Sequence, residues 1–473
     1  MSEDKKMKKQ GNTDETFAQV VQRIAQKQDF LRFDRFVIAQ MTGKLDRREP
    51  KEDTRREAYH IFRDRTGKYD FASLPTMKRW FGINGYAVPH REQIFAVSFF
   101  LHLSEEELYE WLTIGLGEPG VQFNDYHEVI WLYALLKQKN WKEAEKLVHS
   151  YENTLESETV FVRTHTTNQL MEQFGVHKNA SEEEFMQWMY SNASSFKGYS
   201  QTTLDYLNIY KRIITQYICQ DAGKQLKNLL AETDFSVWLR SRTQKDVWSQ
   251  EEAVSKYIYY LGRKKDRSIS EDLFYNIREL NRIANAEENS KQNLLSELFM
   301  VSVQDTSLGN LTPKHLSDLL NLPLQVERSM RADIALKELH EMSEAEECPE
   351  WIQNFMQSCT KRQLSVSKVS EAVKWLERFK AEHHRRCHMV QRKDILPMIL
   401  FVAQRRYQEQ EEMSEYQYEP AKENFVELAN ATLSACGMTA LNTAFKLDAL
   451  LLAAYQKDEM YSYTEIMEIL SGM

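Results

Sequence analysis

The sequence predicts an all-α protein, on three observations. Glycine and proline are scarce, with 15 and 9 among 473 residues, and no proline lies between Pro119 and Pro313. Large sheet proteins need both residue types for their turns. Apolar residues instead recur at helical spacing along most of the chain. Because 42% of the residues are hydrophobic and 28% are charged, the chain can bury a core, and we expect a multi-helical protein rather than a disordered one.

Several function classes are excluded by what the sequence lacks. Neither GxGxxG nor GxxxxGK[ST] occurs, which argues against nucleotide-binding folds. The five cysteines are scattered without a CxxC pair, which favours a reducing cytoplasm and argues against a zinc ribbon. The longest apolar runs, near 95–101 and 447–455, are too short to span a bilayer. The lysine-rich start is followed by no apolar stretch, so we expect a cytoplasmic protein without a membrane partner.

The first third of the chain predicts several short helices with clear start and stop signals. Thr54–Glu57 and Ser104–Glu107 are capping boxes, and Pro75 is tolerated in the first turn of a helix that starts at Ser73. Gly43 and Gly82 are typical helix stops. The expected helices cover residues 13–41, 54–65, 73–82, 89–101 and 104–117.

The remainder predicts longer helices. An amphipathic helical pair covers 123–152, capping signals recur at Ser181 and Ser249, and an acidic, glutamine-rich linker covers 408–419. We therefore divide the chain into an N-terminal helix and tail, a domain of short helices, a central helical domain and a C-terminal helical domain. Their predicted bounds are 1–43, 44–152, 153–308 and 309–473.

The charge is unevenly distributed. The net charge is −9, yet residues 44–91 hold twelve Lys/Arg against seven Asp/Glu, a local charge of +5. The net negative charge argues against a protein whose whole surface binds nucleic acid, but it is compatible with a single basic patch that does.

Two sequence segments, one within the basic stretch 44–91 and one after it, resemble a known family. The first is ASLPTMKRWFG over 72–82, and the second is LHLSEE over 101–106, with Pro89 between them. They resemble the recognition helix and following helices of Cro/repressor-type (XRE-like) helix-turn-helix regulators. The continuation resembles a helical tail of some bacterial members, on the residues Leu112, Gly117, Asp125 and Ile130. The resemblance implies that the domain 44–152 binds double-stranded DNA and that the protein regulates transcription.

Helical geometry assigns sides to the candidate recognition helix. On a helix that begins near Ser73, we expect Leu74, Met77 and the Trp80/Phe81 pair to face inward. The side chains left outward, to meet base edges and phosphates, are Ser73, Thr76, Lys78 and Arg79. Cations nearby in the sequence that can add phosphate contacts are Arg55, Arg56, Arg63, Arg65 and Lys68.

Two weaker echoes accompany this site. The stretches 433–437 and 447–452 resemble 112–117 and 125–130, since each pair gives a helix, a glycine stop, a loop and an acid-led apolar helix. They are a second copy of the helical tail or a chance similarity between amphipathic helices. Separately, residues 312–323, followed by a helix with Arg328 and Arg331, form either a second helix-turn-helix or an ordinary helix pair.

The segment 383–388 is the densest group of potential metal ligands. His384 and His388 have the i, i+4 spacing of zinc ligands, but the two adjacent arginines oppose a cation and there is no HExxH glutamate. Arg378 and His383 also resemble the Arg-x4-His motif of helical HEPN ribonucleases. Arg55/His60 has the same spacing, and Arg378/His384 is one residue longer. Matches of this kind are expected by chance, so we predict no metal and no cofactor.

The first hypothesis is therefore a non-enzymatic DNA-binding regulator whose long helical region senses a signal or dimerises. The second is a helical scaffold or adaptor that binds other proteins, because the chain devotes most of its length to helices without a catalytic constellation. A HEPN-like ribonuclease is the third.

Overall fold

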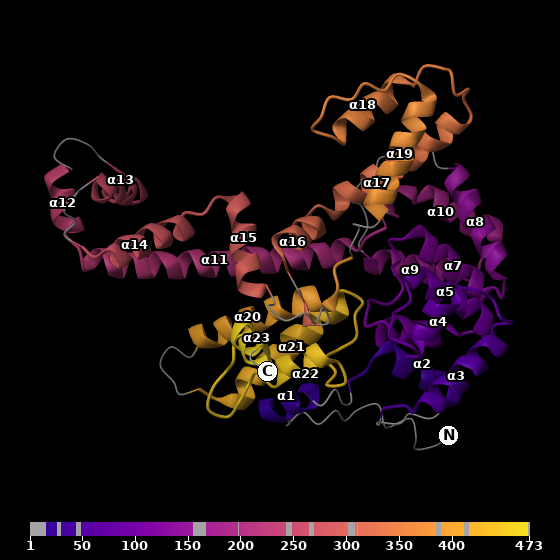
Figure 1. The fold of residues 1–473 in the computed structure, drawn as a ribbon, viewed down its shortest axis with the longest axis horizontal. Coiled ribbons are helices and arrows are strands. Elements are labelled where there is room, and N and C mark those ends of the chain that lie inside the picture. Colours follow the sequence, from indigo (N-terminus) through magenta and orange to yellow (C-terminus); the bar gives the residue numbers. More distant parts are fainter. Residues whose placement is uncertain are drawn as a thin grey trace.

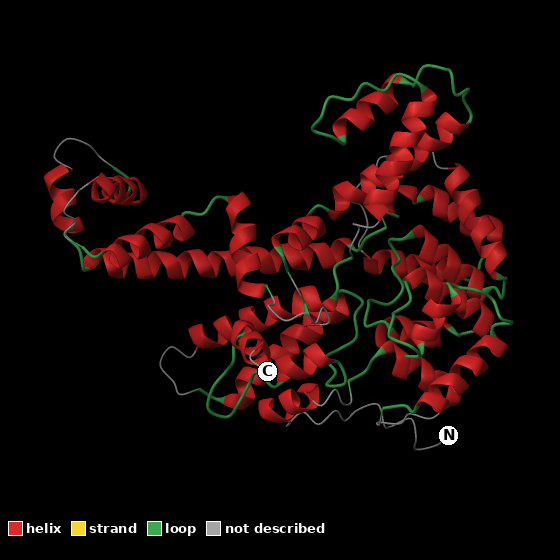
Figure 2. Ribbon diagram, in the orientation of Figure 1, coloured by secondary structure: helices red, strands yellow, loops and turns green. Residues whose placement is uncertain are grey.

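The computed structural model confirms the all-helical class: helices make up 72% of the residues that it describes. It describes residues 16–25, 30–43, 49–154, 167–196, 198–242, 248–263, 269–300, 308–309, 311–384, 389–410 and 416–471. In these ranges extended pairing is limited to isolated bridges, Glu347–Lys368 and Tyr455–Met460. Figure 2 shows helices joined by loops throughout. Within the same ranges, no helix combines the length and apolar character needed to cross a membrane.

One hydrophobic core is built from residues 33–196 and forms what we call the N-terminal lobe (indigo to purple in Figure 1). Its helices are α2 (Phe33–Thr42), α3 (Glu52–Arg65), α4 (Leu74–Trp80), α5 (Arg91–Leu101), α6 (Glu105–Glu110) with a π-helical turn (Trp111–Gly115), α7 (Tyr126–Leu136), α8 (Trp141–Thr154), α9 (Thr167–His177) and α10 (Glu182–Ser191). The predicted capping box at Ser104 is confirmed, and so is the capping signal at Ser181. The capping box predicted at Thr54 is wrong, because α3 already begins at Glu52, after Lys51. Gly43 ends α2 with a φ of 67°, as a left-handed C-cap requires.

A second core forms the C-terminal lobe (its helices α20 to α23 are orange to yellow in Figure 1), and it includes α1, near the start of the described residues. Its helices are α1 (Phe17–Ala25), the first part of α11 (Gln201–Ala231), α15 (Glu288–Phe299), α16 (Pro313–Leu320), α20 (Arg392–Gln410), α21 (Tyr418–Ala435), α22 (Lys446–Leu452) and α23 (Tyr463–Ser471). A 3₁₀ turn over Ala193–Ser195 precedes α11.

Two smaller units project from the lobes (Figure 1). The arm consists of the outer part of α11 with α12 (Phe235–Arg242), α13 (Gln250–Arg263) and α14 (Glu271–Ala284), which share a small core. The other unit consists of α17 (Leu322–His340), α18 (Glu350–Ser358) and α19 (Val369–His384), with a core of its own.

The helix expected over 13–41 is two helices in separate cores, which corrects the prediction. In α1, the Phe17 ring packs on Tyr461 of the C-terminal lobe at 5.1 Å between ring centroids. In α2, the Phe36 ring meets Trp111 of the N-terminal lobe edge-on at 5.5 Å. Residues 30–32 between them are extended coil. Periodicity misses this break because both halves are amphipathic and it does not specify which core each half joins.

A buried arginine organises the loop before α7. Arg91, the first residue of α5, forms an ion pair with Glu128 at 2.7 Å and donates to the carbonyl oxygens of Pro119 at 2.8 Å and Gly120 at 2.9 Å. Glu128 also accepts from the backbone N–H of Gln122 at 2.8 Å. Burial disfavours the charge of Arg91, but Glu128 raises its pKa above the usual range. One guanidinium therefore satisfies carbonyls that no helix can pair.

The same arrangement recurs in the C-terminal lobe. Arg392, the first residue of α20, forms a buried ion pair with Asp448 and donates to the carbonyl oxygen of Thr439 at 3.0 Å. Asp448 accepts from the backbone N–H of Asn442 at 2.9 Å, as Glu128 accepts from that of Gln122, so Gln122 and Asn442 are equivalent. The two stretches of the sequence echo thus share a geometry, but Asp448 corresponds to Glu128 and not to Asp125, which led the similar helix in the sequence comparison.

The two equivalent loops meet each other. Each follows a left-handed glycine, Gly117 with a φ of 70° and Gly437 with a φ of 69°. The backbone N–H of Gly120 donates to the carbonyl of Gly437 at 3.0 Å, and the Gln391 side chain donates to Glu118 at 3.2 Å. The lobes are therefore joined where their arginine-bound loops touch.

A second charge network links α7 to α8. His127 lies between Asp125, at 3.1 Å, and Glu152, at 3.5 Å, and Glu152 also accepts from the hydroxyl of Tyr126 at 2.9 Å. Burial opposes the imidazolium, but hydrogen bonds to the two carboxylates raise the pKa of His127 to about 10. Burial also opposes ionisation of Glu152, yet its hydrogen bonds lower its pKa to about 2. The imidazolium and both carboxylates are therefore charged at neutral pH.

This network predicts a defined pH window of stabilisation. Because its folded pKa is raised from 6.5, His127 contributes fully below pH 6.5 and loses its contribution as the pH rises towards 10. Because its folded pKa is lowered from 4.5, Glu152 contributes fully above pH 4.5 and loses its contribution as the pH falls towards 2. We expect His127→Gln to lower stability most between pH 4.5 and 6.5, by about 1 kcal/mol since the imidazole is partly exposed. Thermal unfolding across pH checks this.

The control is His149→Gln, whose side chain is 71% exposed beside Glu152. We expect that substitution to be nearly silent. A loss in His127→Gln that is constant from pH 4 to 10 would contradict the assigned charges.

Candidate nucleic-acid interface

The C-terminal turn of α4 packs against the core of the N-terminal lobe. Met77, Trp80 and Phe81 are buried, as predicted, and the Phe81 ring lies 5.4 Å from that of Phe62 in α3. Leu74 does not face inward: it is 50% exposed, so that prediction was wrong. The helix spans only seven residues, and its first turn extends past the aromatic side chains that fill the core.

A buried ion pair fixes the end of α4. The Arg55 guanidinium of α3 donates to the carbonyl oxygen of Phe81 at 2.9 Å and to the Asp34 carboxylate of α2 at 2.7 Å. The side chains of Arg55 and Asp34 are 8% and 1% exposed. Gly82 follows with a φ of 72°, and a Cβ there would lie 1.8 Å from the guanidinium. Helices α2, α3 and α4 therefore meet at the Arg55–Asp34 ion pair, and only glycine fits at position 82 beside it.

The loop after α4 is anchored on both sides. The backbone N–H of Ala87 donates to the carbonyl of Arg79 at 3.1 Å, which folds the loop back on α4. The hydroxyl of Tyr86 accepts from the backbone N–H of Phe33, at 3.3 Å, just before Asp34. Burial raises the pKa of Tyr86, so this hydroxyl stays protonated.

Most of the predicted DNA-contacting residues lie on the surface. Lys78 is exposed on α4, and Arg65 and Lys68 are exposed at and just after the end of α3. None of the three forms an ion pair with any residue that the structure describes. These cations are therefore available to a polyanion.

The polar groups of α4 are arranged around one arginine. Arg79 is exposed, and its guanidinium approaches the hydroxyl of Thr76 and the carbonyl of Pro75 at 3.4 Å each. The hydroxyls of Ser73 and Thr76 lie 2.9 Å apart. The outward side of α4 thus presents two hydroxyls and two cations together.

The structure removes two residues from the predicted contact set. Arg55 is buried against Asp34 and the end of α4, so its guanidinium is out of reach of DNA. Arg63 is 14% exposed and donates to the carbonyl of Tyr69 at 2.6 Å and to Asp70 at 2.9 Å. Both positions hold cations for structural reasons, which charge counting does not detect.

The connection between α3 and α4 is longer than a helix-turn-helix uses. Residues 66–73 separate the two helices, whereas the motif has a turn of three to four residues. Thr66 and Lys68 close the end of α3 by backbone bonds to Phe62 and Arg63. The structure therefore shows a helix pair with a basic face.

The second helix-turn-helix candidate, residues 312–323, lies in the C-terminal lobe. In the stretch 312–323, Leu316 and Leu319 are buried in the C-terminal lobe, and His315 bonds to the Asp394 carboxylate at 3.0 Å. Of the arginines that follow, Arg328 donates to a backbone carbonyl and Arg331 pairs with Glu327. This is an ordinary helix pair that takes part in the core.

The histidine candidates add no site. The side chains of 383–388 lie outside the described part of the chain, while Arg378 is exposed on α19. The Arg55/His60 match is broken because Arg55 is buried in its ion pair. Among the residues whose side chains are described, no group of three His, Cys, Asp or Glu residues is placed to hold a metal ion.

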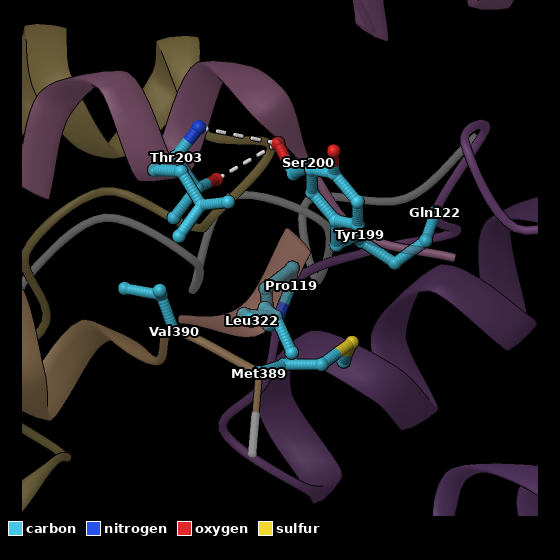
Figure 3. A pocket seen from close by; sticks show the side chains of 9 residues that line it. Pro119, Gln122, Tyr199, Ser200, Thr203, Leu322, Met389 and Val390 are labelled. Atoms are coloured by element: carbon cyan, nitrogen blue, oxygen red, sulfur yellow. Dashed lines mark hydrogen bonds between the residues drawn. The ribbon is translucent and has the colours of Figure 1, made fainter. Parts of the chain in front are cut away.

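A small cavity lies where the lobes and α17 meet (Figure 3). Pro119 and Gln122 of the arginine-bound loop, Tyr199 before α11, and Leu322 of α17 line it. Ser200 accepts from the Thr203 backbone at its edge, at 3.2 Å. Its volume of about 10 Å³ holds one water molecule at most, so it is a packing defect at the joint rather than a ligand site.

Sequence reasoning missed Asp34, which positions α4. The signal was present, because Asp34 interrupts the apolar run of α2 between Phe33 and Phe36 and is fully buried. A carboxylate on an apolar helix face requires a buried cation, and Arg55 in the next helix supplies it.

No family model, no curated protein and no solved structure matches this chain.

The contact between Gly82 and Arg55 predicts a large effect of one methyl group. Gly82→Ala combines a positive φ with a clash against a buried guanidinium, whereas Gly43→Ala meets nothing within 4 Å at a similar φ. We expect Gly43→Ala to lower stability by about 1 kcal/mol and Gly82→Ala by at least about 3 kcal/mol. Calorimetric Tm values of the two variants check this, and equal values would contradict the role of the ion pair.

Proposed function

We propose that the protein binds double-stranded DNA through the basic face of α3 and α4 and acts as a transcriptional regulator. The observation that carries this proposal is the set of exposed cations around α4 in a chain of net charge −9. Free cations on the outward side of a helix whose other side is buried suit a polyanion.

The residues divide by chemistry. Arg65 and Lys68, at the end of α3, are suited to phosphates, whose contacts position a protein without sequence information. Arg79 and the hydroxyls of Ser73 and Thr76 are suited to base edges, and Lys78 to either. The remaining helices sense a signal or dimerise, as recognition of two-fold sites requires.

The direct test mixes the purified full chain with sheared genomic DNA of its host at two salt concentrations and sequences what is retained. Enrichment of a few related sites that survive the higher salt supports a specific regulator. Retention that disappears with salt and shows no preferred sequence reduces the proposal to a basic patch. No retention at either salt refutes it.

A charge-matched pair of variants tests the face itself. We expect Lys78→Ala with Arg79→Ala to weaken DNA binding by about 10- to 100-fold and to reduce the salt slope by about 1 to 2. Lys142→Ala with Lys146→Ala removes the same charge from exposed positions of α8 and should leave both quantities nearly unchanged. Titration of a retained DNA fragment at several salt concentrations measures them. Equal losses in the two double variants would mean that only net charge matters.

The arm supports a second candidate, a scaffold that binds other proteins. It extends away from both lobes (Figure 1) and exposes large apolar side chains, Val237 at 69%, Tyr259 at 61% and Tyr275 at 62%. An open groove of about 460 Å³ runs between α11 and α14, lined by Asn228, Leu280 and four further residues. Large exposed apolar side chains on one projecting unit suit a protein-binding surface.

For this candidate we expect Val237→Ser with Tyr275→Ser to abolish co-purification of a stoichiometric partner from nuclease-treated extract. The Tm and DNA binding should not change, because both side chains lie on the surface of the arm. Pull-down followed by mass spectrometry measures the partner. A partner that is retained by the double variant, or the absence of any partner for the wild type, counts against the scaffold.

A further inference from the structure

Residues 30–34, which we call the strap, carry the chain from one lobe to the other. Phe30 is buried in the core of the C-terminal lobe, and the backbone N–H of Leu31 donates to the carbonyl of Ala444 in that lobe at 2.8 Å. Phe33, three residues after Phe30, is buried in the core of the N-terminal lobe. The strap is therefore held at one end by each lobe.

In the N-terminal lobe, the strap leads to α4. Asp34 binds the Arg55 guanidinium that holds the carbonyl of Phe81. The backbone N–H of Phe33 donates to Tyr86, in the loop that follows α4. The strap thus contacts, directly or through one side chain, both the end of α4 and the loop behind it.

In the C-terminal lobe, the strap leads to the arginine-bound loop 439–445. The Asn442 side chain accepts from the backbone N–H of Ala444 at 2.9 Å, and Asp448 accepts from that of Asn442 at 2.9 Å. Arg392 lies over the Phe445 ring, 4.9 Å from its centroid. The acceptor for Leu31 is therefore placed by the Arg392–Asp448 ion pair.

We propose that the C-terminal lobe controls the presentation of α4 through the strap, so that an event that displaces loop 439–445 regulates the basic face. The regulatory part rests on the proposed function, whereas the mechanical part does not. A helix of seven residues cannot hold its shape without tertiary support, so its order depends on the contacts at its end. A shift of Asp34 leaves the Arg55 charge buried without its partner, and α4 must move or loosen in response.

Hydrogen exchange on the full chain tests the mechanical part. Leu31→Pro removes the N–H that donates to Ala444, and Leu31→Ala retains it while shortening the same side chain. In Leu31→Pro we expect exchange of amides in 82–90 to accelerate at least tenfold, and in Leu31→Ala less than twofold. Acceleration confined to 439–445 would overturn the proposal, since the lobes would then be mechanically independent. Unchanged exchange in α8 verifies that the variant is folded.

A second pair of variants acts from the C-terminal lobe alone. Asp448→Asn weakens the ion pair that places loop 439–445 and touches nothing near α4. Tyr210→Phe removes a buried hydrogen bond to Thr432 in the same core but leaves the Arg392–Asp448 ion pair intact. We expect faster exchange in 82–90 for the first variant and not for the second. Equal effects would show general loosening of the lobe and refute a specific route.

DNA binding is measured on the same four variants with a fragment retained by the wild type. We expect Leu31→Pro and Asp448→Asn to weaken binding about fivefold or more, with their controls within twofold. Faster exchange without weaker binding would separate the strap from regulation and overturn the regulatory part. If the wild type binds no DNA, the proposed function fails, and the exchange data still decide whether the lobes are coupled.

Discussion

The architecture depends on buried arginines that bind backbone carbonyls. An all-helical chain leaves the carbonyl groups of its loops and helix ends without partners, and buried carbonyls need donors. Arg55, Arg91 and Arg392 each supply several donors from one planar group, and each lies beside a carboxylate that compensates its charge. Without these pairs, α4 and the two inter-lobe loops would have no fixed position.

Two of these arginines occupy equivalent places, and this explains how the lobes fit together. Arg91 and Arg392 each begin a helix, and each reaches a carboxylate in the helix that follows the loop, Glu128 or Asp448. Because the same geometry shapes both loops, they present backbone to each other, and the N–H of Gly120 bonds to the carbonyl of Gly437.

The local features of the fold were predictable, and the long-range ones were not. Composition and periodicity predicted the helical class, and the capping box at Ser104 and the inward side of Met77 were confirmed. These depend on neighbours within one or two turns. The pairing of Arg55 with Asp34, the attachment of α1 to the C-terminal lobe and the exposure of Leu74 depend on residues distant in sequence. A local charge of +5 therefore identified the basic face but could not separate its free cations from structural ones.

The placement of α1 in the C-terminal lobe has a consequence for biosynthesis. Phe17 and Val20 leave the ribosome long before Leu450 and Ile466, yet all four share one core. At ~5–20 residues per second, those apolar side chains wait roughly 20 seconds or longer for their partners. The N-terminal lobe can fold during that interval, whereas α1 depends on chaperones or on its own amphipathic surface to avoid wrong partners. The C-terminal lobe therefore completes its core by a late closure that brings α1 together with α20 to α23.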